Sequence, residues 1–267
     1  MAWAAHLAAA GSIAGADGGA DEAGFGGAPG SDPCATSKPC RFDGLVARWP
    51  LDDDFADAAQ RFVGSALDVS GAPSNTPGFV PGIVANAADF RAANALVRIA
   101  PDPALTPLSF SLVFWANSPQ ASLDFPEVLV SKGRDCLANY ECAILPQGKL
   151  RCLINDGRGW CEDSLTVSTP WPTLVWTHVA FTVDDDPGQP MIHLQLFVNG
   201  ALVDRVDVAD SFVVNNPEWP LLFGGHYQEP TGVGVTPYFS RAWLDEVELY
   251  DRVLSAREIR AQYDAAF

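Results

Sequence analysis

Short stretches in which apolar and polar residues alternate follow one another along this sequence from Gly44 onward. In Leu108–Asn117 (LSFSLVFWAN) the alternation places Phe110, Leu112 and Phe114 on one face of an extended strand. About a dozen such stretches can be traced, which is more than one flat sheet usually holds. The pattern therefore predicts two antiparallel sheets packed face to face.

Turn signals separate the stretches, and the strongest is Asn199-Gly200 between two alternating segments. This dipeptide favours a type I′ turn, because both central residues of that turn need a positive φ angle. One helix is predicted at the C-terminal end, where Ser255 and Glu258 have the spacing of a capping box. The sequence thus predicts an all-β sandwich with one short C-terminal helix.

The negative charge balance argues against two classes of binding partner, nucleic acids and anionic membranes. The chain has 33 acidic and 16 basic residues among 267, and its formal net charge is −17. Nucleic-acid binding needs clustered Lys and Arg, and anionic membranes attract the same residues, so neither partner is expected. No run of 18 apolar residues occurs in the sequence, and no membrane span is predicted.

Composition predicts where the folded domain begins. Residues 1–42 are mostly Ala and Gly at their start and are predicted to be a leader and flexible linker. The first 16 residues are apolar and end in a sequence that suits signal peptidase, although they contain no basic residue. Residues 43–267 are predicted to form one domain.

The cysteines favour disulfides and an oxidising compartment. The chain has six of them, at Cys34, Cys40, Cys136, Cys142, Cys152 and Cys161. No C-x-x-C pair occurs, which argues against a zinc site. Cys34 and Cys40 are predicted to pair because they are isolated. A bridge from Cys142 to Cys152 across a hairpin would leave Cys136 with Cys161, and the alternative is Cys136–Cys142 with Cys152–Cys161.

Several segments together resemble one family, the bacterial type of laminin G-like domain. The segments are LVARWPLDD (45–53), LSFSLVFWANS (108–118), WTHVAFTVD (176–184), LQLFVNGALVD (194–204) and WLDEVELYDRVLSAREIRAQY (243–263). The resemblance covers residues 43–267 and places the chain in the concanavalin A-like lectin/glucanase superfamily. It implies a jelly roll of two antiparallel sheets and a recognition role outside the cell, often with bound calcium.

Asp245 is the most informative acidic residue. Strand alternation would place it on one face with Trp243, Val247 and Leu249. A carboxylate among apolar neighbours has to be hydrogen-bonded, paired or bound to a metal. The resemblance implies that the first and last strands lie close together. Asp245 and Asp52 are therefore predicted to hold a structural calcium ion, and the alternative is an Asp that accepts backbone hydrogen bonds.

The predicted function is non-catalytic binding of a polysaccharide or an extracellular glycoprotein by a secreted or cell-surface domain, supported by calcium. Trp160 and Tyr227 are the predicted ligand-binding rings, because Trp160 is expected in a loop and Tyr227 near one, and exposed aromatic rings stack on sugars. One alternative is a structural or adhesive spacer of a surface assembly. Another is a glycoside hydrolase using Glu246 and Glu248, although the E-x-D-x-E pattern of the superfamily's glucanases is missing.

Overall fold

The structure is a computed structural model that describes most of the chain from residue 41 onward. The ranges described are 41–68, 70–91, 94–119, 125–133, 138–154, 165–209, 215–228, 234–235 and 239–266. The predicted boundary between residues 42 and 43, and the linker before it, stay predictions.

Within the described residues, eight strands form an antiparallel sheet that we call sheet I. Its order is β13-β12-β11-β6-β17-β4-β3, and β1 also pairs with β17. The strands are β1 (Leu45–Trp49), β3 (Gly78–Pro81), β4 (Asn86–Asp89), β6 (Phe110–Asn117), β11 (Thr177–Asp184), β12 (Met191–Val198), β13 (Ala201–Ala209) and β17 (Trp243–Tyr250). The first and last strands are therefore neighbours, as the resemblance implied.

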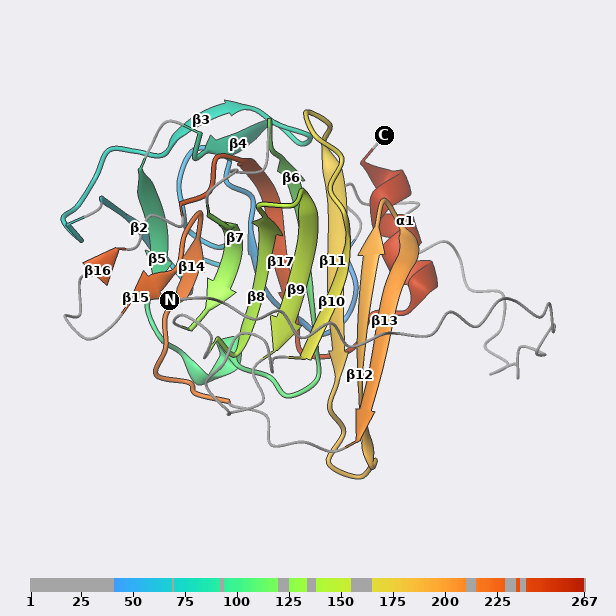
Figure 1. The fold of residues 1–267 in the computed structure, drawn as a ribbon. Helices are drawn as coiled ribbons and strands as arrows, with labels where there is room; N and C mark the ends of the chain where they lie inside the picture. Colours follow the sequence, from blue (N-terminus) through green and yellow to red (C-terminus); the bar gives the residue numbers. More distant parts are fainter. Residues whose placement is uncertain are drawn as a thin grey trace, which may run out of the picture. The chain divides into compact units, whose positions relative to one another are not determined.

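The second layer, sheet II, contains seven of the described strands in the order β10-β9-β8-β7-β14-β5-β2 (Figure 1). These are β2 (Gly64–Asp68), β5 (Ala95–Ile99), β7 (Glu127–Lys132), β8 (Tyr140–Leu145), β9 (Lys149–Ile154), β10 (Leu165–Pro170) and β14 (Leu221–Phe223). The pair β15 (Tyr227–Gln228) and β16 (Gly234–Val235) and the short 3₁₀ helix η1 (Pro103–Leu105) complete the described elements with helix α1 (Ala256–Ala265). The two-sheet prediction is confirmed.

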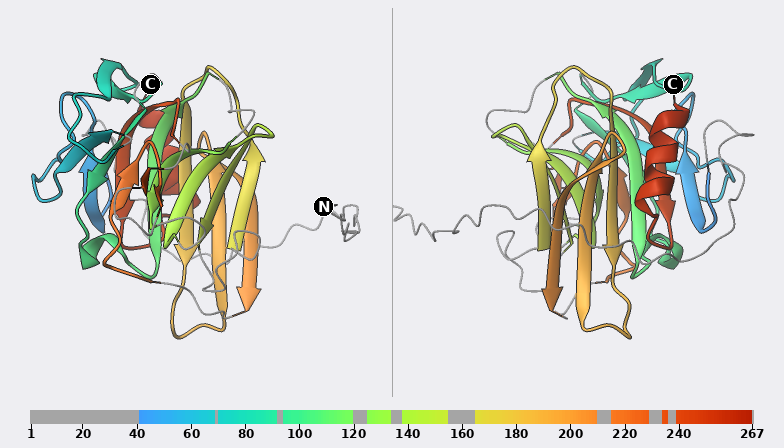
Figure 2. Two further views of the ribbon diagram at one scale, coloured as in Figure 1. Left: turned by 60° about the vertical axis from the view of Figure 1, so that its left-hand side comes forward. Right: turned by 90° about the vertical axis from the view of Figure 1, so that its right-hand side faces the viewer.

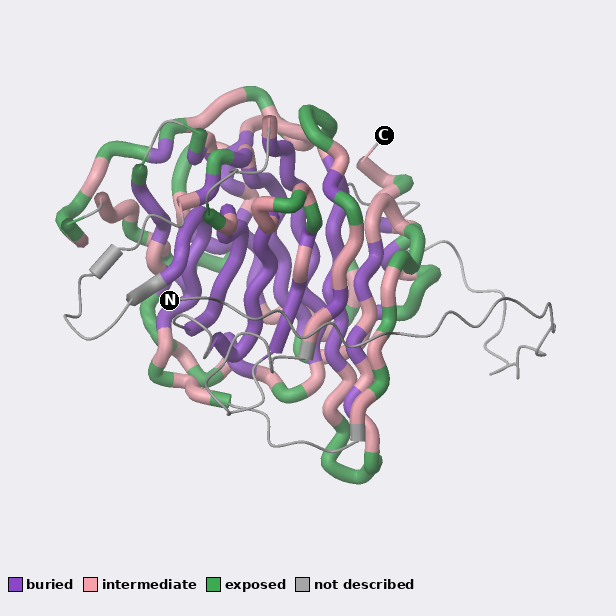
Figure 3. Tube along the Cα trace, in the orientation of Figure 1, coloured by how far each residue is buried: buried purple, intermediate pink, exposed green. Residues whose placement is uncertain are grey.

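The core fills the space between the sheets. Phe110 and Phe181 of sheet I pack against each other at 5.9 Å between ring centroids, and Phe110 meets Tyr140 of sheet II at 5.0 Å. On the other side of the core, Trp49 lies edge-on to Phe223 at 5.3 Å. Figure 3 shows the central strands of both layers as buried. Alternation drives this packing, since every second side chain of each strand points inward.

Two predicted local features are confirmed. Asn199 and Gly200 have φ angles of +52° and +75°, as a type I′ turn requires, and they join β12 to β13. At the C-terminus, the Ser255 side chain accepts from the Glu258 amide, and the Glu258 side chain accepts from the Ser255 amide. This capping box starts α1 at Ala256.

Helix α1 lies against the outer face of sheet I, the face turned away from sheet II (Figure 2). Leu254 and Ile259 form a second apolar cluster there with Val113 of β6 and Tyr250 of β17. The ring of Tyr263 stacks on Trp115 of β6 at 5.8 Å. No helix in the described parts of the chain is long and apolar enough to span a bilayer.

One predicted disulfide falls within the described residues. Cys142 of β8 and Cys152 of β9 lie opposite each other in the register and are bonded. This pairing excludes the alternative in which Cys142 joins Cys136 and Cys152 joins Cys161. The remaining four cysteines, Cys34, Cys40, Cys136 and Cys161, lie outside the described residues.

Candidate functional site

The last strand, β17, carries a β-bulge that gathers its acidic residues. Glu246 has a φ angle of +50°, and the register against β6 shifts between Asp245 and Glu248. Asp245 lies opposite Trp115 and Glu248 opposite Val113, and both partners face α1. The bulge therefore places acidic side chains on the outer face of sheet I, within reach of the helix.

The bulge corrects the predicted alternation of β17. Regular alternation would place Asp245 on the same face as Val247 and Leu249, but those two residues lie in the core between the sheets. Asp245 instead lies on the outer face, where it is fully buried. The extra residue in the bulge reverses the side to which the following side chains point, so the predicted burial was right and the predicted face was wrong.

Asp245 is held by the backbone of the segment before β4. Its Oδ2 atom accepts hydrogen bonds from the amides of Ile83, at 2.7 Å, and Val84, at 3.1 Å. Burial raises the pKa of Asp245 to about 7 against the effect of these hydrogen bonds, and the charges of Glu246 and Asp52 raise it further. Keeping the Asp245 carboxyl ionised at this position therefore costs free energy.

Asp52 lies near Asp245, as predicted from the neighbouring first and last strands. Its Oδ1 atom accepts a hydrogen bond of 2.9 Å from the amide of Asn86, and its charge acts on Asp245. The Oδ1 atom of Asp245 is buried and has no hydrogen-bond partner in the part of the chain that the structure describes. An orphaned carboxylate oxygen beside a second carboxylate fits a hard cation. The described residues contain no group of three or more acidic, His or Cys side chains placed to hold a metal, so backbone or water oxygens would have to complete the coordination.

An arginine from β1 neutralises part of the acidic cluster. The Nε and Nη2 atoms of Arg48 each donate to one carboxylate oxygen of Glu246. Arg48 Nε also lies 3.7 Å from Glu248 Oε1. Both oxygens of Glu246 are therefore engaged in a fork-shaped ion pair. Glu246 and Glu248, the two carboxylates of the glycosidase alternative, are therefore both in contact with Arg48.

Glu248 links the strand to the helix. Its Oε2 atom accepts hydrogen bonds of 2.7 Å from the Tyr250 hydroxyl and 2.7 Å from Gln262 Nε2 of α1. Burial raises the pKa of Glu248 to about 7, despite the hydrogen bond from Tyr250. The network fixes the last two turns of α1 over the bulged strand.

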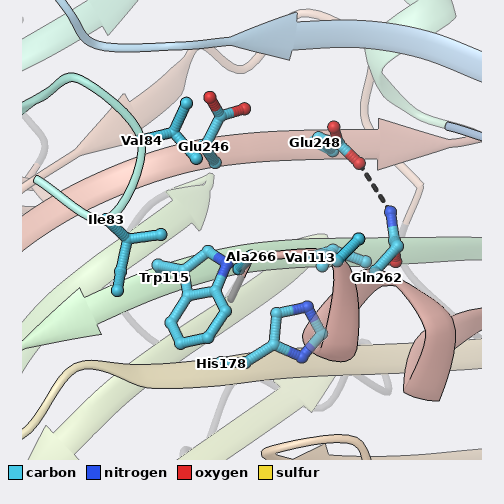
Figure 4. A pocket seen from close by; sticks show the side chains of 10 residues that line it. Ile83, Val84, Val113, Trp115, His178, Glu246, Glu248, Gln262 and Ala266 are labelled. Atoms are coloured by element: carbon cyan, nitrogen blue, oxygen red, sulfur yellow. Dashed lines mark hydrogen bonds between the residues drawn. The ribbon is translucent and has the colours of Figure 1, made fainter. Parts of the chain in front are cut away.

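A cavity of about 200 Å³ opens beside this network, between the end of α1 and sheet I (Figure 4). His178 of β11 forms part of its wall, and burial lowers the pKa of this imidazole to about 3, so the ring is neutral. The lining combines apolar and acceptor side chains. Its residues are Ile83, Val84, Val113, Trp115, His178, Glu246, Glu248, Gln262, Ala265 and Ala266.

A second polar cluster, not predicted from the sequence, lies on the outer face of sheet II. Glu141 of β8 accepts a hydrogen bond of 3.3 Å from Arg151 Nη2 of β9, and its other oxygen lies 3.4 Å from Nδ1 of His226. Ser131 of β7 is paired with Glu141 in the register, and its buried hydroxyl has no hydrogen-bond partner among the residues described. The signal in the sequence was the alternation of β8, which turns Glu141 away from the core.

The predicted ligand-binding rings are only partly located. Trp160 lies outside the described residues. The backbone of Tyr227 begins the short strand β15, directly after His226 of the sheet II cluster, and its side chain is outside the described part of the chain. Their role in binding stays a prediction.

Comparison with known proteins identifies the fold family. A laminin G family model, described as concanavalin A-like lectin/glucanases superfamily, matches residues 91–260. No curated protein sequence matches the chain.

Solved structures share the fold at low sequence identity. Domain 4 of AbnA, an extracellular GH43 arabinanase from Geobacillus stearothermophilus solved with arabinotriose, superposes with a TM-score of 0.61 and 18% identity over 84% of this chain and 98% of that domain. The binding domain of Paraclostridial Mosquitocidal Protein 1 gives 0.59 and 17% over 83% of this chain and 52% of its own. The botulinum neurotoxin DC binding domain in complex with SialylT gives 0.60 and 12%, with 84% and 52% covered. The chain belongs to the concanavalin A-like lectin/glucanase superfamily, through its laminin G branch.

Proposed function

We propose that this chain is a non-catalytic domain that recognises carbohydrate, free or on a glycoprotein, outside the cell. The fold is shared with nearly the whole of an arabinanase domain whose structure contains arabinotriose, and with binding domains of two toxins. The disulfide between Cys142 and Cys152 supports an oxidising compartment. A shared fold alone leaves the ligand open, so the proposal needs a site.

The observation that carries the proposal is the polar cluster on the outer face of sheet II. Glu141 and Arg151 offer a carboxylate and a guanidinium side by side, and His226 adds an imidazole. Beside them, the Ser131 hydroxyl is buried and has no hydrogen-bond partner within the described residues. Buried polar groups without partners are rare in folded proteins, because each costs about 1–3 kcal/mol. Because Ser131 is 0% exposed, a sugar hydroxyl would satisfy it only if a side chain of this cluster moves aside on binding.

Calcium is proposed to support this domain from a separate position, at Asp52 and Asp245. The orphaned Oδ1 atom of Asp245 and the charge of Asp52 would both be satisfied by a divalent cation. The cation would tie the segment after β1 to β17, and its role would be structural. It would hold these acidic side chains ionised at neutral pH.

Binding to a glycan array that includes arabinotriose and sialylated glycans, with calcium and with chelator, tests the function. A Ser131→Ala variant removes a hydroxyl that makes no hydrogen bond within the described residues, so its melting temperature should stay within a degree or two of the parent's. Its affinity for any glycan found should fall about fivefold, the value of one hydrogen bond.

Thr106→Val is the matched control, because the Thr106 hydroxyl is also buried without a hydrogen-bond partner in the described part of the chain, but Thr106 is the C-cap of η1, away from the cluster. This variant should bind as the parent does. An array with no bound glycan under either condition, or equal affinity in the Ser131→Ala and Thr106→Val variants, would remove the proposed site.

A further inference from the structure

The cavity between α1 and sheet I is lined by buried polar atoms that have no hydrogen-bond partner among the described residues. Gln262 is 8% exposed and His178 is 1% exposed, so both side chains are more than nine-tenths buried. The Oε1 atom of Gln262 and the Nδ1 atom of His178 have no hydrogen-bond partner within the described residues. Figure 4 shows both side chains among those that line the cavity, with His178 near the ring of Trp115 and Gln262 bonded to Glu248. Two orphaned polar atoms at one cavity indicate a missing ligand.

The polar lining consists mainly of acceptors. Glu246 and Glu248 add carboxylates, and the one amide donor, Gln262 Nε2, is already used by Glu248 at 2.7 Å and by the Tyr250 hydroxyl at 3.0 Å. A ligand that satisfies this lining therefore has to bring donors. A neutral hydroxyl would bring only one.

The local charge favours a cation over a neutral donor. Four carboxyl groups lie in this region, on Asp52, Asp245, Glu246 and Glu248, and the basic groups whose charges act on them are the guanidinium groups of Arg41 and Arg48. Without calcium at Asp52 and Asp245, two acidic groups are thus left without a basic partner.

The C-terminal end of α1 adds to the negative charge around the cavity. Ala265 and Ala266 line the cavity at the C-terminus of α1, where backbone carbonyls carry partial negative charge. The last turn of α1 contains no basic side chain to balance it.

We propose that this cavity binds a primary alkylammonium ion, with the ammonium group at the carboxylates and Gln262 Oε1. A primary ammonium has three N–H donors on one charged atom, which matches a lining of several acceptors. The alkyl chain would lie against Trp115, Val113 and Ile83, which form the apolar part of the wall. A volume of about 200 Å³ admits a short chain, since a water molecule takes about 30 Å³. The site is distinct from the proposed glycan site on sheet II.

The test is an NMR titration of the full chain with n-butylammonium chloride, in chelator and at constant ionic strength. The signals followed are the Trp115 indole N–H and the Gln262 side-chain amide. Both should shift and saturate at millimolar ligand. Tetramethylammonium chloride, a cation without donors, and 1-butanol, a neutral molecule with the same alkyl chain, should each bind at least tenfold more weakly.

An Ala266→Phe variant fills the cavity from the end of α1 and leaves the buried carboxylates in the sequence. Its affinity for n-butylammonium should fall at least tenfold. The matched control is Ala256→Phe, which adds the same ring at the exposed start of the same helix and should leave the affinity unchanged. The proposal is wrong if no saturable shift occurs, if 1-butanol or tetramethylammonium binds equally well, or if Ala266→Phe retains the affinity of the parent.

Discussion

Gln262 and Glu248 are joined by a hydrogen bond of 2.7 Å between Gln262 Nε2 and Glu248 Oε2, which ties the C-terminal helix to the bulged strand of sheet I. Glu248 is the more consequential member of this pair, because it is 3% exposed and lies close to other carboxylates. An ionised carboxylate at such a position costs free energy that a protonated one does not. The helix contact is therefore sensitive to pH.

Glu248→Gln should raise the free energy of unfolding above that of the parent, and this gain should be larger at neutral pH than at acidic pH. Burial raises the pKa of Glu248 to about 7 from its ordinary value of 4.5. Its favourable contribution is fully present below pH 4.5 and is lost as the pH rises to about 7, because only the unfolded chain then releases the proton easily. The gain of the variant between pH 4.5 and pH 8 should be on the order of 3 kcal/mol, measured by urea unfolding.

The control for this experiment is Glu218→Gln, which neutralises an exposed carboxylate. Its effect on the free energy of unfolding should be small and similar at both pH values. If Glu248→Gln also shifts stability equally at pH 4.5 and pH 8, ionisation of Glu248 does not explain the pH dependence.

Patterns of local origin could be predicted from the sequence, and features that depend on pairing could not. The turn at Asn199-Gly200 and the cap at Ser255 follow from backbone preferences within a few residues. The bulge at Glu246 arises where β17 meets β1 on one side and β6 on the other, and no local signal marks it. For this reason the sequence predicted that Asp245 is buried near the first strand but assigned it to the wrong face.

The polar contacts of both candidate sites could not be predicted from the sequence for the same reason. Arg48 and Glu246 are 198 residues apart in sequence, and Glu141 and His226 are 85 residues apart. Side chains so distant meet only because the strands that carry them are ordered by the whole jelly roll. Alternation predicts which face a residue occupies, whereas strand order decides which residues share that face.

Calcium should raise the melting temperature of the parent relative to chelator, and Asp245→Asn should abolish the rise. A ligand that binds only the folded state stabilises it in proportion to the logarithm of its concentration over its dissociation constant. Asparagine keeps a side-chain oxygen for the amides of Ile83 and Val84, so the fold should survive the change. The measurement is thermal unfolding with millimolar calcium or EGTA.

Asp264→Asn serves as the control, because Asp264 is exposed and pairs with Arg260 one helical turn away. This variant should keep the full response to calcium. A parent whose melting temperature is the same in calcium and in EGTA would contradict the proposed ion site.

Removing the Cys142–Cys152 bridge should lower the free energy of unfolding by about 3 kcal/mol, as expected for a closed loop of this length. The variant is Cys142→Ala with Cys152→Ala, and the measurement is urea unfolding. Both side chains are fully buried, so a small packing loss adds to the effect.

Peptide mapping without reduction checks the pairing itself. Trypsin cuts after Lys149 and Arg151, which separates Cys142 from Cys152. The predicted product is a peptide from Asp135 to Lys149 that is disulfide-linked to the peptide beginning at Cys152. Detection of the first peptide with Cys136 and Cys142 joined internally would contradict the structure.

The turn between β12 and β13 provides a test of how α1 is seated. A methyl group added at Gly200 would lie 2.8 Å from Arg260 Cδ and 3.2 Å from the backbone Cα of the same residue. Gly148, in the turn between β8 and β9, has a similar φ angle of +68° but no atom within 4 Å of such a methyl group. Substitution by alanine therefore imposes the same backbone strain at both sites and a steric conflict with α1 at only one.

Gly148→Ala should lower the free energy of unfolding by about 1–2 kcal/mol, the cost of holding an alanine at positive φ. Gly200→Ala should cost distinctly more, because Arg260 or the whole helix has to move away. The displacement should also weaken the stacking of Tyr263 on Trp115, which near-ultraviolet circular dichroism reports. Equal losses of stability in the two variants, with unchanged spectra, would mean that α1 does not press against this turn in solution.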